Sequence, residues 1–172
     1  MEARATTGNV ELRAALERAL QHTSAGLYKA AIERLKSVHR HNVMVLAHNG
    51  PDHRKKASCC YGFAFGVQPL SSASVTTLLQ NGALRHRRSR ARNGDVVLYF
   101  NDAGQLQHAG VIIDAPGRIR SKWARGEVHE HDLWEVPLSY GNFVEACVPP
   151  SVLRILALLK EPLVSPRRST RM

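Results

Sequence analysis

The chain is poor in several residue types that define particular classes of protein. Its 172 residues include only three cysteines, and aromatic residues make up 6% of the sequence. Cys59 and Cys60 are adjacent, which argues against a disulfide framework and predicts at least one free thiol in a reducing compartment. Long apolar runs are also missing. Because none approaches the ~18 residues that a membrane span requires, we expect no transmembrane helix.

The first residues carry no sign of an export signal. Residues 1–8 (Met-Glu-Ala-Arg-Ala-Thr-Thr-Gly) lack a basic stretch followed by an apolar block. We therefore expect a cytoplasmic protein. A chain of this kind that acts outside the cytosol needs a dedicated export system.

Acidic residues are few relative to basic ones. The chain has 14 aspartates and glutamates against 24 lysines and arginines, a net charge of +10. Five arginines lie within eight residues, namely Arg85, Arg87, Arg88, Arg90 and Arg92. This run predicts either a solvated loop or a surface that binds nucleic acid or another polyanion. No aromatic residues are interleaved with the arginines, so any such binding should be weak and independent of sequence.

The pattern of apolar residues predicts helices first and strands afterwards. Helical spacing covers residues 9–20 and 27–38, and further helices are expected at 60–65, from residue 72 to about 80, and after Ser151. Strands are expected at 96–100, 107–113, 118–123 and 143–148, with a hairpin turn at 101–104. The short apolar run at 43–46 is either a further strand or the continuation of a helix. This order is typical of an α+β protein. We divide the chain into a helical layer (1–41), a main domain (42–160) and a basic flexible tail (161–172).

A thiol and an imidazole occupy positions that favour catalysis. Cys60 stands where an apolar helix begins, and His108 stands where a strand begins. A helix N-terminus and a nearby imidazolium both stabilise a thiolate, which is the nucleophilic form of cysteine. The alternative is that both residues are structural, since free cysteines are often buried and inert.

Three segments in this order resemble the NlpC-like cysteine peptidases of bacterial cell-wall turnover. They are residues 60–64 (Cys-Tyr-Gly-Phe-Ala), 94–97 (Gly-Asp-Val-Val) and 108–112 (His-Ala-Gly-Val-Ile), and the similarity covers residues 58–123. The resemblance implies a minimal papain-like fold, in which a central helix packs on an antiparallel sheet of about four to six strands. It also implies a cysteine hydrolase that needs no cofactor, with residues 42–160 as the catalytic domain.

The resemblance further implies roles for particular residues. Glycine follows the family's nucleophile by two positions, which selects Cys60 over Cys59, and His108 matches the base. Ser121 matches the residue that orients the imidazole, and strand alternation places it on the same side as Ile119 and Trp123. The rival orienting residues are His129 and His131.

The sequence indicates the substrate and the binding partners only by chemical class. The expected substrate is a peptide, a peptidoglycan peptide or another amide, contacted by Tyr61 and Trp123. A zinc site formed by His129 and His131 with Cys147 or Cys60 is a weaker alternative, because no established ligand spacing supports it. A different class of function is a catalytically degenerate papain-like fold that binds polyanions through the arginine run.

Overall fold

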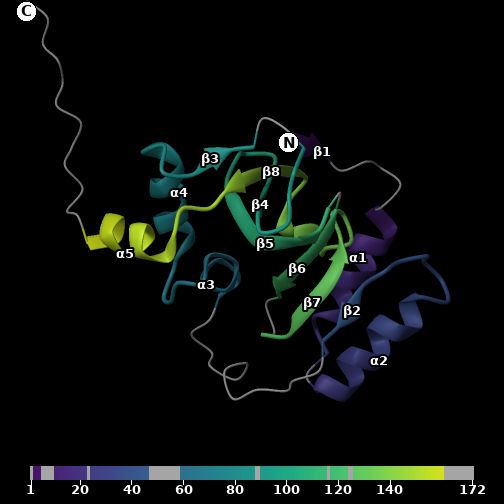
Figure 1. The fold of residues 1–172 in the computed structure, drawn as a ribbon. Coiled ribbons are helices and arrows are strands. Elements are labelled where there is room, and N and C mark those ends of the chain that lie inside the picture. The colour runs from purple at the N-terminus through teal and green to yellow at the C-terminus, as the bar shows by residue number, and fades with distance from the viewer. Residues whose placement is uncertain are drawn as a thin grey trace, which may run out of the picture.

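The computed structural model describes residues 2–4, 10–22, 24–46, 59–87, 90–115, 117–123 and 126–160. Within these ranges the protein has an α+β architecture, with helices packed against an antiparallel sheet (Figure 1). The predicted basic tail, residues 161–172, lies outside the described residues. No helix in the described ranges is long and apolar enough to cross a membrane.

The sheet contains eight strands in the described part of the chain. Seven follow one another in the order β1-β8-β4-β5-β6-β7-β2, and β3 also pairs with β8. Every pairing is antiparallel. The strand bounds are β1 Glu2–Arg4, β2 Met44–Val45, β3 Arg85–His86, β4 Val96–Phe100, β5 Leu106–Asp114, β6 Arg118–Lys122, β7 Val128–Asp132 and β8 Phe143–Val148.

Helices cover both faces of this sheet (Figure 1). One face carries α1 (Val10–Ala19) and α2 (Ala25–Leu35). The other face carries α3 (Cys60–Phe65), α4 (Ser72–Gln80) and α5 (Val152–Lys160). The helices α2, α3 and α4 begin where a side chain caps the first turn, with Ser24, Cys59 and Ser71 as the caps.

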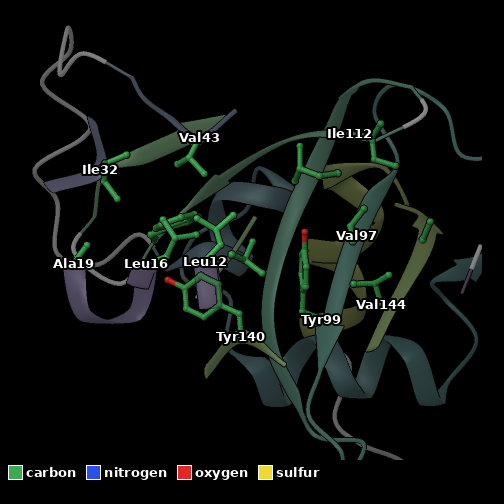
Figure 2. Packing of buried hydrophobic residues seen from close by; sticks show 14 of the residues in the cluster. Leu12, Leu16, Ala19, Ile32, Val43, Val97, Tyr99, Ile112, Tyr140 and Val144 are labelled. Atoms are coloured by element: carbon green, nitrogen blue, oxygen red, sulfur yellow. The ribbon is translucent and has the colours of Figure 1, made fainter. Parts of the chain in front are cut away.

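Alternation along the central strands builds a hydrophobic core on each face. Val97 and Tyr99 of β4 pack with the residues of α1 and α2, as Figure 2 shows for Leu12, Leu16 and Ile32. The other face holds the second core, which contains Val96, Leu98, Ala109, Tyr61, Phe65, Val75, Leu78 and Ile155. Because successive side chains of a strand point to opposite faces, β4 and β5 contribute to both cores.

The predicted elements are largely confirmed, and the sheet is larger than expected. α3, β4 and β8 have the predicted bounds, and β4 and β5 are antiparallel neighbours across the turn at residues 101–104. The expected four to six strands become eight because β7 and the short strands β1 and β3 were not predicted. The N-terminal 41 residues accordingly supply a strand as well as two helices.

Candidate active site

Cys60 lies in the first turn of α3, on the face of the sheet that holds the Leu98 and Ala109 side chains. Its thiol faces the backbone N–H of Ala109, the residue that follows His108 on β5. Cys59 has a different role. Its sulfur accepts a hydrogen bond from the Gly62 N–H at 3.5 Å and donates to the Leu70 carbonyl at 2.7 Å. Cys59 thereby caps the helix that presents Cys60.

The Cys60 thiol is neutral in this structure. Burial raises its pKa to about 11, and the nearby N–H groups of Ala109, Tyr61 and Cys60 itself offset that effect only in part. Burial also raises the pKa of Cys147 to about 11. In the resting structure burial thus outweighs the stabilisation of a Cys60 thiolate by the N–H groups at the start of the helix.

His108 is buried within an aromatic cluster on the opposite face of β5 from Ala109. Its ring stacks on Tyr140 with centroids 3.9 Å apart and planes inclined by 20°, and Tyr99 lies 5.5 Å away. Burial lowers the pKa of His108 well below its ordinary value, and the nearby His131 and His129 act in the same direction. The Nε2 atom of His108 is buried, and no hydrogen-bond partner for it lies within the described residues.

The structure brings the segments of Cys60 and His108 together without a hydrogen bond between the two side chains. The thiol meets β5 at the amide of Ala109, while the imidazole turns toward Tyr99 and Tyr140. Thiol and imidazole thus lie on opposite faces of β5, and both are neutral. They form no thiolate–imidazolium pair in this state.

Ser121 lies on the expected side of β6, but its hydrogen bonds lead away from His108. Its hydroxyl lies 2.8 Å from His131 Nε2 and accepts the Trp123 indole N–H at 3.0 Å. His131 Nδ1 lies 2.9 Å from the Asp132 carbonyl. Since a carbonyl only accepts, Nδ1 carries the hydrogen and Nε2 accepts from Ser121. Ser121 therefore holds His131 and Trp123 in place and does not orient His108.

The two rival histidines are also engaged elsewhere. His129 Nε2 accepts from the Tyr28 hydroxyl at 2.8 Å, and its Nδ1 lies 3.1 Å from the Glu127 carbonyl. Burial is the main cause that lowers the pKa of His129 to about 3 and that of His131 to about 4. Both rings are neutral and hydrogen-bonded away from His108, so none of the three predicted orienting residues contacts it through a hydrogen bond.

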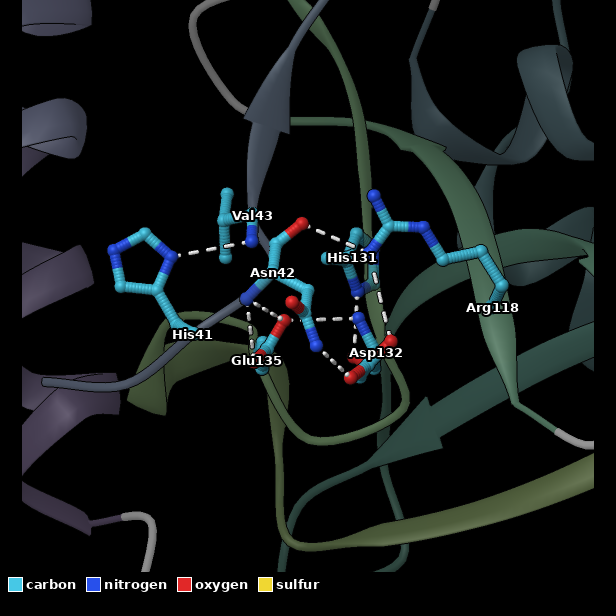
Figure 3. A network of polar contacts seen from close by, with 7 residues as sticks. All are labelled: His41, Asn42, Val43, Arg118, His131, Asp132 and Glu135. Atoms are coloured by element: carbon cyan, nitrogen blue, oxygen red, sulfur yellow. Dashed lines mark hydrogen bonds and ion pairs between the residues drawn. The ribbon is translucent and has the colours of Figure 1, made fainter. Parts of the chain in front are cut away.

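A polar network fixes the end of β7 beside His131 (Figure 3). The Glu135 carboxylate accepts the backbone N–H groups of Asn42 and Asp132. The Asn42 amide donates to Asp132 at 2.7 Å, and Arg118 donates to the Asn42 carbonyl at 2.8 Å. These bonds join β6, β7 and the segment before β2.

The two predicted substrate-contacting residues are parts of the core. Tyr61 is buried and donates to the Leu106 carbonyl at 3.3 Å. Trp123 is buried and stacks on His129 with centroids 4.0 Å apart. Both rings are buried in this structure, so their contact with a substrate stays a prediction.

The zinc alternative gains no support from the structure. Among the residues that the structure describes, no group of three or more His, Cys, Asp or Glu side chains is arranged to hold a metal ion. Cys147 lies in the core on the α3 face, whereas His129 and His131 point into the cluster on the α1 and α2 face.

One arginine of the run has a structural role, and three others are exposed to solvent. Arg87 donates to the buried Asp95 carboxylate at 2.8 and 2.5 Å, and the Arg92 backbone N–H donates to the same carboxylate. The side chains of Arg85, Arg90 and Arg92 are exposed, while Arg88 lies outside the described residues. Within the described ranges, no ion pair engages these three exposed arginines.

Two residues escaped the sequence analysis, Tyr140, which stacks on His108, and the buried Arg13. Tyr140 belongs to the short 3-10 helix η3 (Leu138–Tyr140), and Arg13 belongs to α1. Arg13 is 1% exposed and donates to the carbonyls of Val136 and Gly141 and to the Asn142 side chain. The sequence offered one signal, an arginine three residues before Leu16 on the apolar stripe of the first helix.

Comparison of the chain with protein-family models, with curated proteins and with solved structures found no match. The functional argument therefore depends on the motifs and on the geometry of the site.

Proposed function

We propose that the protein is a cysteine hydrolase of amide or related acyl bonds, with Cys60 as nucleophile and His108 as base. The observation that supports this most directly is that α3, which begins at Cys60, packs against β5, the strand that carries His108. The papain-like resemblance requires a thiol on a buried helix to meet a histidine-bearing strand at such a point. A neutral resting pair is compatible with general-base catalysis, in which the proton leaves the thiol as the substrate is attacked.

The proposed reaction has two steps. The Cys60 sulfur forms a bond to the substrate carbonyl carbon while its proton passes to His108, and the protonated imidazole then gives that proton to the departing amine. Water next attacks the thioester with His108 as base, which releases the acid and restores the thiol. In the resting structure the His108 imidazole lies on the opposite face of β5 from the Cys60 thiol, so the first transfer requires residue 108 to turn its side chain toward α3. Nε2 has no hydrogen bond within the described residues to hold it back.

His108→Gln tests this proposal. We expect hydrolysis of peptidoglycan stem peptides, peptide amides or aryl esters to fall by about 10²–10⁴-fold, the usual contribution of a general acid–base residue. His86→Gln is the matched control, because His86 is exposed on β3. Initial rates for both variants and the wild type decide the outcome. Hydrolysis that survives in His108→Gln would exclude His108 as the base.

A second candidate function is a polyanion-binding module built on the same fold. The exposed arginines Arg85, Arg90 and Arg92 and the absence of a thiolate–imidazolium pair favour it. Arg90 and Arg92 also border a surface hollow of about 580 Å³ with Ala91, Asn93 and Ala115. A wild-type protein that hydrolyses none of the substrates above, yet binds polyanions tightly, supports this candidate over the hydrolase.

Replacing Arg85, Arg90 and Arg92 together by serine tests polyanion binding without disturbing the Arg87–Asp95 pair. We expect weak binding of single-stranded nucleic acid by the wild type. The slope of log K against log salt should lose about 2 in the variant, at ~0.7 per phosphate contact. Fluorescence anisotropy across a salt series measures this slope. The control removes three exposed arginines on other elements, namely Arg18, Arg34 and Arg40. Equal losses in both triple variants would show that net charge, and not this surface, is responsible.

A further inference from the structure

The helix α5 (Val152–Lys160) is apolar on the side that faces solvent. Ile155 is its one fully buried residue, and it lies in the core that α5 shares with α3 and α4. Leu153 precedes Ile155 by two positions, and a helix turns by about 100° per residue, so the two side chains lie almost opposite each other. The exposed fraction of Leu153 is 79%. A surface helix usually carries polar residues opposite its buried stripe, whereas α5 carries leucine there.

The exposed aliphatic residues of α5 form one continuous band. Leu153, Leu156 and Leu159 follow one another at intervals of three residues, which makes them neighbours on the helix surface. Leu156 and Leu159 are 38% and 39% exposed, and Val152, at 44%, extends the band to the first residue of the helix. Val152 also lies against the end of α3, where a Cβ on Gly66 would be 3.7 Å from its Cγ2. The band therefore belongs to a helix that is packed on the domain (Figure 1).

The charges beside this band are positive. α5 contains no acidic residue, and its two basic side chains, Arg154 and Lys160, are exposed. Within the described part of the chain, neither takes part in an ion pair. The sequence that continues from Lys160, residues 161–172, adds three arginines and a single glutamate. A partner of this surface must therefore offer apolar contacts and negative charge together.

An anionic lipid bilayer offers this combination, and a second copy of the chain does not. Helices with an apolar face and flanking lysines or arginines lie in the plane of a membrane surface, with the apolar side chains among the acyl chains and the bases near anionic headgroups. A symmetric contact between two copies would instead bring the basic residues of both α5 helices together, in a chain whose net charge is +10. Like charges at such a contact oppose association.

We infer that α5 binds the surface of an anionic lipid bilayer, with Leu153, Leu156 and Leu159 inserted between the lipids and with Arg154 and Lys160 at the headgroups. This surface lies on α5 and not on the arginine run at residues 85–92. The inference does not depend on the proposed hydrolase function, because it uses no residue of the candidate active site.

Co-sedimentation of the full chain with lipid vesicles tests this inference. Vesicles of phosphatidylcholine with about 30% phosphatidylglycerol should bind the wild type about tenfold or more tightly than vesicles of phosphatidylcholine alone. Replacing Leu153 and Leu156 together by serine should weaken binding to the anionic vesicles about tenfold or more, because the inserted apolar area is lost. The matched control replaces Leu27 and Val38, which are 60% and 74% exposed, and should bind within about twofold of the wild type.

Several outcomes would overturn the inference. Equal weakening in the two double variants would show that exposed apolar residues in general, and not α5, carry the binding. If serine at Arg85, Arg90 and Arg92 abolishes binding while the Leu153 and Leu156 variant binds normally, the lipids bind the arginine run. A wild type that binds neither kind of vesicle contradicts the inference directly.

The oligomeric state of the chain decides the main alternative occupant. Light scattering should show no dimer that depends on Leu153, and a dimer that Leu153→Ser dissociates would assign the band to a second copy. Thermal unfolding checks that each variant is folded. If the double variant at Leu153 and Leu156 unfolds, Leu153→Ser alone, at the most exposed position of α5, should still weaken binding to the anionic vesicles by about threefold or more.

Discussion

Replacement of Cys60 by alanine is expected to lower amide hydrolysis by at least about 10³-fold, since loss of a nucleophile removes the covalent pathway altogether. Cys59→Ala is the matched control, because the two thiols are adjacent in sequence and differ in role. Cys59 caps α3 through its contact with the Gly62 N–H. Its loss should therefore lower the free energy of unfolding by about 0.5–2 kcal/mol while the folded protein keeps its activity.

Rates at saturating substrate, together with urea unfolding curves, separate these two effects. Cys59→Ser should recover most of the lost stability, because a hydroxyl is a good acceptor at a helix N-cap. The reverse pattern, in which Cys59→Ala is inactive and Cys60→Ala is active, would transfer the nucleophile to Cys59. Equal activity in both variants would contradict any thiol mechanism and leave polyanion binding as the better account of this fold.

The sequence was sufficient for elements whose apolar pattern or cap is local. α3 and α4 were predicted from a polar residue before an apolar stripe, β4 from a continuous apolar run, and β8 from a mostly apolar segment that contains Glu145. Ser121 was correctly placed beside Ile119 and Trp123, because side-chain alternation in a strand depends only on sequence position. Each of these inferences needed information from no more than about ten neighbouring residues.

The strand β7 was not predicted because its sequence, Val-His-Glu-His-Asp, is polar. It forms a strand because two of its polar side chains find partners on distant elements. His129 meets Tyr28 of α2, and His131 meets Ser121 of β6. Arg13 has the same explanation, since its acceptors lie more than 120 residues away. Buried polar groups are stable only when they are paired, and pairing over such separations is invisible to local pattern.

The sequence motifs did not predict the orientation and protonation of Cys60 and His108, for a similar reason. The order of Cys60 and His108 predicts that their segments meet, and α3 does pack against β5, but the two side chains lie on opposite faces of that strand. The ring orientation and the protonation of both groups depend instead on burial and on Tyr99, Tyr140, His129 and His131. These neighbours come from three elements, so no single motif encodes the state of the site.

The second large expected effect concerns the stability that Asp95 contributes. This residue follows Gly94 and lies directly before β4. The Asp95 side chain is 3% exposed and accepts two hydrogen bonds from Arg87 and one from the Arg92 N–H. Asp95→Asn keeps the shape but removes the charge, and leaves the Arg87 guanidinium without its carboxylate. Breaking a buried pair costs about 3–5 kcal/mol, and the partial exposure of Arg87 places our expectation at about 2–4 kcal/mol of unfolding free energy.

The pKa of Asp95 determines whether the stability of the protein rises or falls with pH. Burial by itself opposes ionisation of Asp95, but hydrogen bonds from Arg87 and the Arg92 amide outweigh it, so the pKa of Asp95 lies below its ordinary value. A carboxyl whose pKa is depressed by folding stabilises the native state above its unfolded pKa of about 3.9. That stabilisation is lost as the pH falls through the folded pKa. The wild type should therefore lose stability from about pH 5 downward more steeply than Asp95→Asn.

Urea unfolding at pH 7 and at pH 3 measures both parts of this expectation. Asp114→Asn is the control, because Asp114 is exposed at the end of β5 and no ion pair engages it within the described residues. Its free energy of unfolding should lie within about 0.5 kcal/mol of the wild-type value, as is usual for surface substitutions.

Arg87→Met should be at least as destabilising as Asp95→Asn, since it leaves the buried carboxylate without its guanidinium partner. If both Asp95→Asn and Arg87→Met unfold like Asp114→Asn, the Asp95 carboxylate does not hold the arginine run against β4. Arg87 would then be available to a polyanion as well, and the serine substitutions at Arg85, Arg90 and Arg92 would have to be extended to Arg87.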